Sequence, residues 1–174
     1  MKTLVLVFHP DLKNRSNANA ALAKAASAMP GDAVTVRDEY ALYPDGRIDV
    51  AAEQRLVEEH DRIVLQFPLY WYSAPALLKE WEDQVLAYGW AYGDGGEALN
   101  GKELTVALTA GGPASEYQHD DGGATIDEVL APYRMTARYT HAVWGEPFTV
   151  FRSMELADDE LAAAGEAYRA FLGR

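Results

Sequence analysis

Short apolar runs alternate along this chain with longer segments whose apolar residues recur at helical spacing. Thr3–Phe8, Arg62–Phe67 and Leu104–Thr109 are mostly apolar, which is typical of strands buried on both faces of a sheet. Two further strands are predicted at Ala33–Arg37 and near His141–Trp144. The pattern therefore predicts five strands.

Helical segments separate these strands. Helices are predicted at Asn17–Met29, at Val50–His60, around Thr125–Tyr133 and from Asp158 onward. Another follows the third strand, where one face collects the apolar residues Leu77, Leu78, Trp81, Val85 and Tyr88. Alternating strands and helices predict an α/β fold, in which helices cover both faces of a parallel sheet and residues 1–174 form a single domain.

The composition narrows the classes of function. The 174 residues carry a net charge of −12, which argues against nucleic acid as a partner. The chain has no cysteine, so disulfides and thiol nucleophiles are excluded. The apolar run Leu4–Phe8 is too short for a secretion signal, and no other segment approaches a membrane span, so we expect a cytoplasmic protein.

Ligands of open α/β sheets bind beyond the carboxyl ends of the strands. The segments that leave the first, third and fourth strands, His9–Asn19, Pro68–Tyr72 and Thr109–Tyr117, are therefore expected to meet at one edge. In the first segment, Arg15-Ser16-Asn17 offers a cation, a hydroxyl and an amide at a helix N-terminus. These groups suit a phosphate, although an ordinary helix cap is the alternative.

The other two segments add flat and hydrogen-bonding surfaces. Tyr70-Trp71-Tyr72 can form an aromatic wall, with burial in a core or interface as the alternative. Gly111 and Gly112 allow close approach to backbone N–H groups, although a tight turn explains them equally well. Together the three segments predict a pocket for a flat, phosphorylated cofactor.

The sequence also resembles a known family. Phe67–Trp81, Gly89–Gly93 and Ala98–Lys102 are similar to the NAD(P)H:quinone oxidoreductases of flavodoxin-like fold. The short bacterial members, which include the ancillary flavoproteins of glutathione-gated potassium efflux systems, are the most similar. The resemblance implies a three-layer sandwich with five parallel strands in the order 2-1-3-4-5, a bound flavin and a homodimer.

The resemblance also implies site residues. Carried over position by position, the cofactor-binding residues are His9, Arg15, Ser16, Asn17, Ala18, Asn19, Gln66, Pro68, Leu69, Tyr70, Trp71, Tyr72, Thr109, Ala110, Gly111, Gly112 and Tyr117. Tyr117 is also the expected catalytic residue. Some members place a histidine six residues after that tyrosine, where this chain has Gly123. The resemblance therefore implies His119, at a different spacing, as the catalytic partner of Tyr117. We expect His119-Asp120-Asp121 to be a solvated loop and not a metal site.

These implications favour a flavin-dependent NAD(P)H:quinone oxidoreductase that transfers hydride in two half-reactions of ping-pong order. FMN is favoured over FAD because the chain is short. The sequence does not distinguish NADH from NADPH, and it does not identify the final electron acceptor.

The aromatics Trp81, Trp90 and Tyr92 exceed what one small core needs, which indicates a homodimer interface, with simple burial as the alternative.

Other functions remain as alternatives. One is a flavodoxin-type electron carrier, although residues 9–17 (HPDLKNRSN) lack the glycines of its usual phosphate loop. Another is a regulatory ancillary subunit of a membrane potassium-efflux antiporter. A cofactor-free α/β hydrolase is disfavoured because Gly-x-Ser-x-Gly is missing from the sequence.

Overall fold

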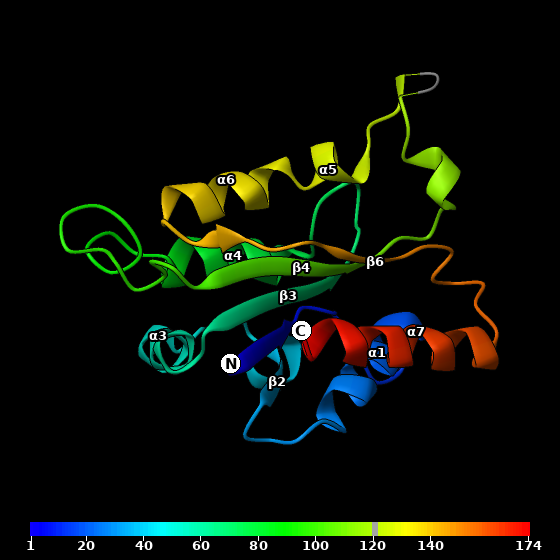
Figure 1. The fold of residues 1–174 in the computed structure, drawn as a ribbon, viewed down its shortest axis with the longest axis horizontal. Helices are drawn as coiled ribbons and strands as arrows, with labels where there is room; N and C mark the ends of the chain where they lie inside the picture. Colours follow the sequence, from blue (N-terminus) through cyan, green and yellow to red (C-terminus); the bar gives the residue numbers. More distant parts are fainter. Residues whose placement is uncertain (120–121) are drawn as a thin grey trace.

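A parallel sheet forms the middle layer of the computed structural model, which describes residues 1–119 and 122–174. Its strands are β1 (Thr3–Val7), β2 (Val34–Asp38), β3 (Arg62–Pro68), β4 (Glu103–Thr109), β5 (Val143–Trp144) and β6 (Phe148–Val150). The order is β2-β1-β3-β4-β5, and β6 also pairs with β4 (Figure 1). The predicted strand order is therefore confirmed.

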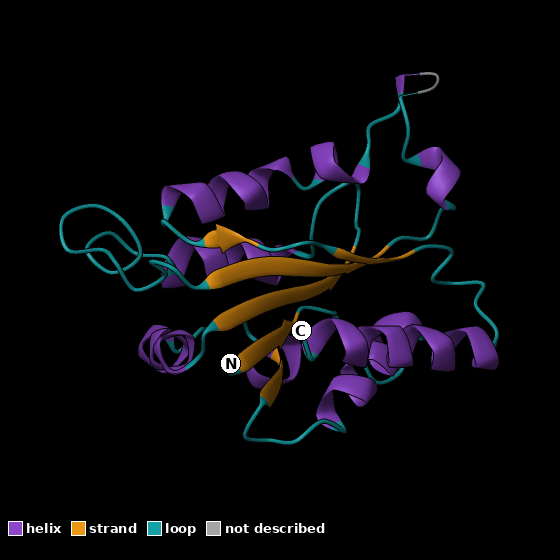
Figure 2. Ribbon diagram, viewed as in Figure 1, coloured by secondary structure: helices purple, strands orange, loops and turns teal. Residues whose placement is uncertain are grey.

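Helices cover both faces of this sheet. One layer is built by α1 (Ala18–Ser27) and α7 (Asp158–Leu172), which pack against each other. The opposite layer holds α3 (Val50–Glu59), α4 (Ala76–Val85), α5 (Ile126–Val129) and α6 (Ala131–Tyr139) (Figure 2). Two short turns of helix, α2 (Glu39–Leu42) and η1 (Ala114–Glu116), complete the described elements.

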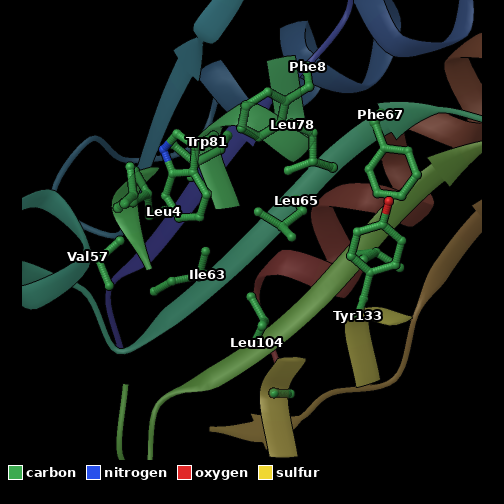
Figure 3. Close-up of a cluster of buried hydrophobic side chains, with 14 of the residues drawn as sticks. Leu4, Phe8, Val57, Ile63, Leu65, Phe67, Leu78, Trp81, Leu104 and Tyr133 are labelled. Atoms are coloured by element: carbon green, nitrogen blue, oxygen red, sulfur yellow. The ribbon is translucent and has the colours of Figure 1, made fainter. Parts of the chain in front are cut away.

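The apolar core follows the alternation of side chains along the strands. Leu4, Leu6 and Phe8 are buried toward α4, whereas Val5 and Val7 are buried toward α1. Phe8 meets the ring of Trp81 edge-on, with 6.2 Å between the ring centroids (Figure 3).

Trp81 is a core residue. It is only 2% exposed, and its indole N–H donates to Glu53 Oε2 at 3.0 Å. The prediction that Trp81 contributes to a subunit interface is therefore wrong, and burial, the alternative, holds. The reason is that a buried carboxylate satisfies the indole N–H, which allows the whole ring to enter the core.

The edge strand of the sheet is divided. Val143 and Trp144 stand opposite Glu103 and Leu104, and Phe148–Val150 stand opposite Ala107–Thr109. Three residues, Gly145–Pro147, therefore face only two residues of β4, which makes a bulge of one extra residue. The sequence predicted only the first half, because a three-residue strand after a Gly-Glu-Pro break gives no readable alternation.

The predicted helix around Thr125–Tyr133 is also divided. The Thr125 hydroxyl accepts a hydrogen bond from the Glu128 N–H, and the Glu128 carboxylate accepts one from the Thr125 N–H, which starts α5. Pro132 lies in the first turn of α6, where its missing N–H is tolerated. Within residues 1–119 and 122–174, no helix has the length and apolar character to cross a membrane.

Candidate functional site

Four chain segments leave the sheet at the carboxyl ends of its strands. They are residues 8–19 after β1, 69–73 after β3, 110–119 after β4 and 151–155 after β6. Figure 1 shows the arrowheads of β3, β4 and β6 pointing to the same edge. The predicted meeting of the first three segments at this edge follows from the parallel pairing of β1, β3 and β4.

His9 is a buried, hydrogen-bonded residue at the start of the first segment. It is 6% exposed, and its Nδ1 accepts a hydrogen bond from the Asp11 N–H at 3.1 Å. The proton of the neutral ring therefore resides on Nε2. Burial lowers the pKa of His9 despite the opposing effect of Asp11, so the neutral ring with Nε2–H as donor is favoured at neutral pH.

The N-terminus of α1 offers several free donors. The Ser16 hydroxyl accepts from the Ala20 N–H at 3.1 Å, but Ser16 precedes the N-cap residue Asn17, whose side chain makes no capping hydrogen bond. The N–H groups of Asn17, Ala18 and Asn19 nevertheless have no acceptor among the described residues. Together with the exposed Arg15, they form a cradle suited to an anion such as a phosphate.

The aromatic segment has an unusual backbone. Trp71 and Tyr72 have φ angles of 50° and 60°, in the left-handed region that bulky residues rarely adopt. Paired backbone hydrogen bonds between Tyr70 and Ser73 hold this turn at 2.9 and 3.0 Å. The Trp71 and Tyr72 N–H groups find no acceptor in the described chain, and Trp71 is 94% exposed. The turn thus presents a flat apolar wall and two donors.

The glycine segment contributes two more free donors. The N–H groups of Gly111 and Gly112 have no acceptor within residues 1–119 and 122–174. The Ala110 N–H, in contrast, donates to the Val150 carbonyl at 2.8 Å. A Cβ at Gly112 would overlap the Glu116 carboxylate, so glycine allows that carboxylate to pack there.

Tyr117 closes the glycine segment. Its ring packs on Phe151 with the centroids 5.5 Å apart, and it is half-buried. Burial raises its pKa, as do the nearby Glu116 and Tyr72. The Tyr117 hydroxyl is therefore a stable proton donor at neutral pH.

A buried chain of polar side chains connects three of these elements. Gln66 Nε2 donates to the carbonyl oxygen of Asn19 at 3.0 Å and to Asn19 Oδ1 at 3.2 Å. Asn19 Nδ2 in turn donates to Thr109 Oγ1 at 2.7 Å. All three residues are at most 3% exposed, and Gln66 Oε1 has no partner among the described residues.

A cavity of about 420 Å³ lies beside the aromatic segment, between α4 and α6. Its walls include Tyr72, Ser73, Glu82 and Tyr133. Burial raises the pKa of Glu82 to about 7 and raises the pKa of Tyr133 as well. This cavity gives a molecule at the aromatic wall additional room.

The free groups at this edge fit a flavin. They are donors from three separate segments, whereas a flavin offers an anionic phosphate and several acceptor atoms on its ring. The exposed aromatic wall matches the flat apolar ring. The orphaned Gln66 Oε1 shows that polar groups beneath the site also lack partners within the described chain.

Comparison with known proteins identifies the family. The family model described as flavodoxin-like fold matches residues 1–172. The chain belongs to this family. The flavodoxin-like fold class and the resemblance inferred from the sequence are therefore confirmed.

Relatives of this flavodoxin-like protein carry several names. A relative from Cronobacter sakazakii, named glutathione-regulated potassium-efflux system ancillary protein KefG, is 42% identical over 172 residues, which cover 98% of this chain and 92% of the relative. Among solved structures, general stress protein 14 from Treponema denticola in complex with FMN has a TM-score of 0.94 at 42% identity, covering 99% of this chain and 98% of that one. An NADPH-quinone reductase from P. pentosaceus has a TM-score of 0.86 at 32% identity, with the same coverage of 99% and 98%.

The predicted site residues of this flavodoxin-like chain separate into three groups. His9, Arg15–Ala18, Leu69–Tyr72, Gly111, Gly112 and Tyr117 belong to the segments at the carboxyl edge. Asn19, Gln66, Thr109, Ala110 and Pro68 are buried beneath them. The third group is His119, which is exposed. Its Nδ1 is 3.7 Å from Glu128 Oε2, so its contact is with Glu128 and not with Tyr117. Asp120 and Asp121 lie outside the described residues.

The sequence analysis missed the fourth segment of the site. Arg152 N–H donates to the Gly112 carbonyl at 3.0 Å, and Ser153 N–H donates to the Ala110 carbonyl at 2.9 Å. These bonds hold Phe151 against Tyr117 and place the exposed Met154 beside Gly111. Recognising Phe148–Val150 as a strand would have revealed this segment, because its end would then fall at the same edge.

Proposed function

We propose that this protein is an FMN-dependent oxidoreductase that transfers two electrons from NAD(P)H to a quinone or a related electrophile. The observation that carries the proposal is the set of N–H groups without an acceptor among the described residues on three segments of one sheet edge, at Asn17–Asn19, Trp71–Tyr72 and Gly111–Gly112. The FMN complex of general stress protein 14 and the NADPH-quinone reductase support the choice of cofactor and substrates.

Each segment has a separate task in this proposal. FMN, when bound, supplies the hydride chemistry. The Asn17–Asn19 N–H groups and Arg15 bind the phosphate, and the Gly111 and Gly112 N–H groups stabilise negative charge on the ring. Trp71 and Tyr72 form an apolar surface beside the ring and exclude water from it.

Substrates would use the space between the aromatic wall and Tyr117. NAD(P)H and the quinone occupy it in turn, which gives the reaction a ping-pong order. The Tyr117 hydroxyl holds its proton and donates a hydrogen bond to the oxygen on which charge develops. His119 is kept as a candidate partner of Tyr117, although its Nδ1 lies near Glu128 Oε2. Because NAD(P)H is a cytoplasmic reductant, we place the reaction in the cytoplasm.

The first experiment is a spectrum of the purified protein after addition of FMN or FAD and removal of free flavin. We expect FMN to be retained, and anaerobic NADPH to bleach its bands in one step, with a quinone restoring them. Retention of neither flavin would contradict the proposal. Accumulation of a stable one-electron reduced state would instead favour the electron carrier.

A second candidate function rests on the KefG relative, which matches 98% of this chain. Its name describes an ancillary protein of a potassium-efflux system, so this chain could serve a membrane antiporter of that class. The test is co-purification with the antiporter of the same organism, using wild-type protein with and without FMN. Specific co-purification would support this second function, and failure to co-purify under both conditions would count against it.

A further inference from the structure

Glu82 is a carboxylate without a hydrogen-bond donor among the described residues, and it lines the cavity between α4 and α6. It is half-buried, and burial is the largest cause of its raised pKa. Lys79, one turn earlier on α4, is the cation whose charge acts on it, but the Lys79 ammonium forms an ion pair with Asp83. A carboxylate removed from water is unfavourable unless another group compensates its charge. The described chain therefore leaves this carboxylate in want of a partner.

The cavity beside Glu82 has the size and walls of a small-molecule site. Its volume of about 420 Å³ falls within the range of roughly 300–1,000 Å³ that is usual for such sites. Apolar walls come from Leu86, Val129 and Pro132, and hydroxyl groups come from Ser73 and Thr136. This combination suits a ligand with an apolar body and one polar end.

Two tyrosines add to the walls of this cavity. Tyr133 is only 6% exposed, and its ring packs on Phe67 with the centroids 5.3 Å apart, so its position is fixed (Figure 3). Tyr72 is 69% exposed, which leaves much of its ring available to a ligand. The face of an aromatic ring attracts cations as well as other flat rings.

We propose that this cavity binds an organic cation with a flat aromatic body, in which Glu82 pairs with the ammonium group and Tyr72 contacts the aromatic body. The Tyr133 hydroxyl oxygen accepts a second hydrogen bond from the ammonium. A neutral ligand would leave the carboxylate uncompensated, and an anionic ligand would be repelled by it. The inference goes beyond the proposed function, because binding in this cavity does not require a flavin.

The test uses three probes of similar shape and different charge: phenethylammonium, the neutral phenethyl alcohol and the anionic phenylpropionate. Isothermal titration calorimetry measures their dissociation constants on the protein with FMN, and again without added FMN. We expect the wild type to bind the ammonium at least roughly tenfold more tightly than the alcohol, which is the effect of one charge-assisted hydrogen bond. Phenylpropionate should bind most weakly.

Glu82→Gln keeps the shape of the side chain and removes its charge. We expect this variant to bind the ammonium no more tightly than the alcohol, and to bind the alcohol as the wild type does. Tyr133→Phe should weaken the ammonium by a smaller factor.

Glu80→Gln is the matched control, because Glu80 lies on the same helix but is exposed and does not line the cavity. It makes the same change to the net charge of −12, so it measures any general attraction of cations to this acidic protein. The preference for the ammonium should survive in this variant.

The pH dependence gives an independent readout. The titratable and charged groups that face Glu82 are Lys79 and Asp83 on α4, Tyr133 on α6, and Tyr72. Because the pKa of Glu82 is raised to about 7, the wild type should bind the ammonium roughly tenfold more tightly at about pH 8 than at about pH 6. Glu82→Gln should remove this dependence.

Three results would each overturn the inference. They are equal affinities of the wild type for the ammonium and the alcohol, tighter binding of phenylpropionate, and an equal loss of preference in Glu80→Gln and Glu82→Gln. Failure of the protein to retain FMN would count against the proposed function alone, since the three probes are also titrated without added FMN.

Discussion

At the scale of single residues, the Tyr117 hydroxyl is a proton donor that the surroundings keep protonated. Burial is the largest cause of its raised pKa, and Glu116 and Tyr72 act in the same direction. We expect Tyr117→Phe to lower kcat roughly tenfold, the effect of one lost hydrogen bond at the reacting oxygen. Steady-state kinetics with a quinone acceptor measure this, and FMN content should change little. Full activity would remove Tyr117 from the reaction.

The phosphate cradle gives a second prediction at this scale. Replacing both Arg15 and Ser16 by alanine removes a charge and a hydroxyl beside the free N–H groups of α1. We expect the FMN dissociation constant to rise roughly 10- to 100-fold, in line with lost hydrogen bonds to a charged group. Lys13→Ala, an exposed cation in the same segment, is the control. Unchanged FMN content after desalting would reject the cradle.

Residue types predicted part of this site and backbone geometry determined the rest. Arg15, Ser16, Gly111 and Gly112 were readable because cations, hydroxyls and glycines have recognisable chemistry beside a strand end. The free donors of Trp71 and Tyr72 depend on two left-handed φ angles, which no rule based on residue type assigns to aromatic residues. Such strained backbone is set by tertiary contacts and not by local preference.

At the scale of elements, the short helix α2 buries the carboxylate of Glu39 at a place where few groups stabilise its negative charge. Glu39 is fully buried and contacts Arg37 at 3.3 Å, but its Oε2 has no partner in the described chain. Glu53, in α3, accepts from Arg37 at 2.6 Å and from Tyr43 at 2.7 Å. Burial, and then the charge of Glu53, raise the pKa of Glu39 to about 7.

This raised pKa predicts how stability depends on pH. Glu39 binds its proton more tightly in the folded protein than in the unfolded chain, where the ordinary value is 4.5. Its contribution to the free energy of unfolding is therefore complete below about pH 4.5 and is lost as the pH rises to about 7, a change of roughly 3 kcal/mol.

Urea unfolding between pH 4.5 and pH 7 measures this effect. Glu39→Gln should flatten the decline of stability over this range. The pKa of Glu82 is also raised to about 7, so Glu82 makes its own contribution to the loss of stability with rising pH. Glu82→Gln should therefore remove that contribution and leave the one from Glu39. If Glu39→Gln leaves the slope unchanged, Glu39 is ionised in the folded protein throughout the range.

The sequence predicted most elements because the spacing of apolar residues along the chain indicates which faces of a strand or helix are buried. The fully buried β1, β3 and β4 appear as continuous apolar runs, and α4 appears as one apolar face. The divisions of the edge strand and of the helix after Thr125 were missed, because they depend on pairing with β4 and on Pro132 in the first turn of α6. Two or three residues are too few for a period to be visible.

At the scale of the whole molecule, exposed aromatics suggest that the protein is a homodimer. Trp71 is 94% exposed, Tyr72 is 69% exposed, and Tyr88 and Tyr139 are each 66% exposed. Aromatic residues are enriched at subunit interfaces, so we expect light scattering to give twice the 19.1 kDa mass of one chain. A mass of 19.1 kDa at micromolar concentration would show a monomer.

The length of the Gly145–Pro147 connection fixes which side chains reach the site from the last segment. Because successive residues of a strand point to opposite faces, deleting two of these three residues would place the residue now at 151 opposite Thr109 and invert Phe148–Val150, whereas deleting one would only remove the bulge. The number of residues in this connection therefore matters more than their identity. We expect deletion of both Gly145 and Glu146 to abolish the contact of Phe151 with Tyr117, whereas deletion of Glu146 alone, or Glu146→Ala, should keep it.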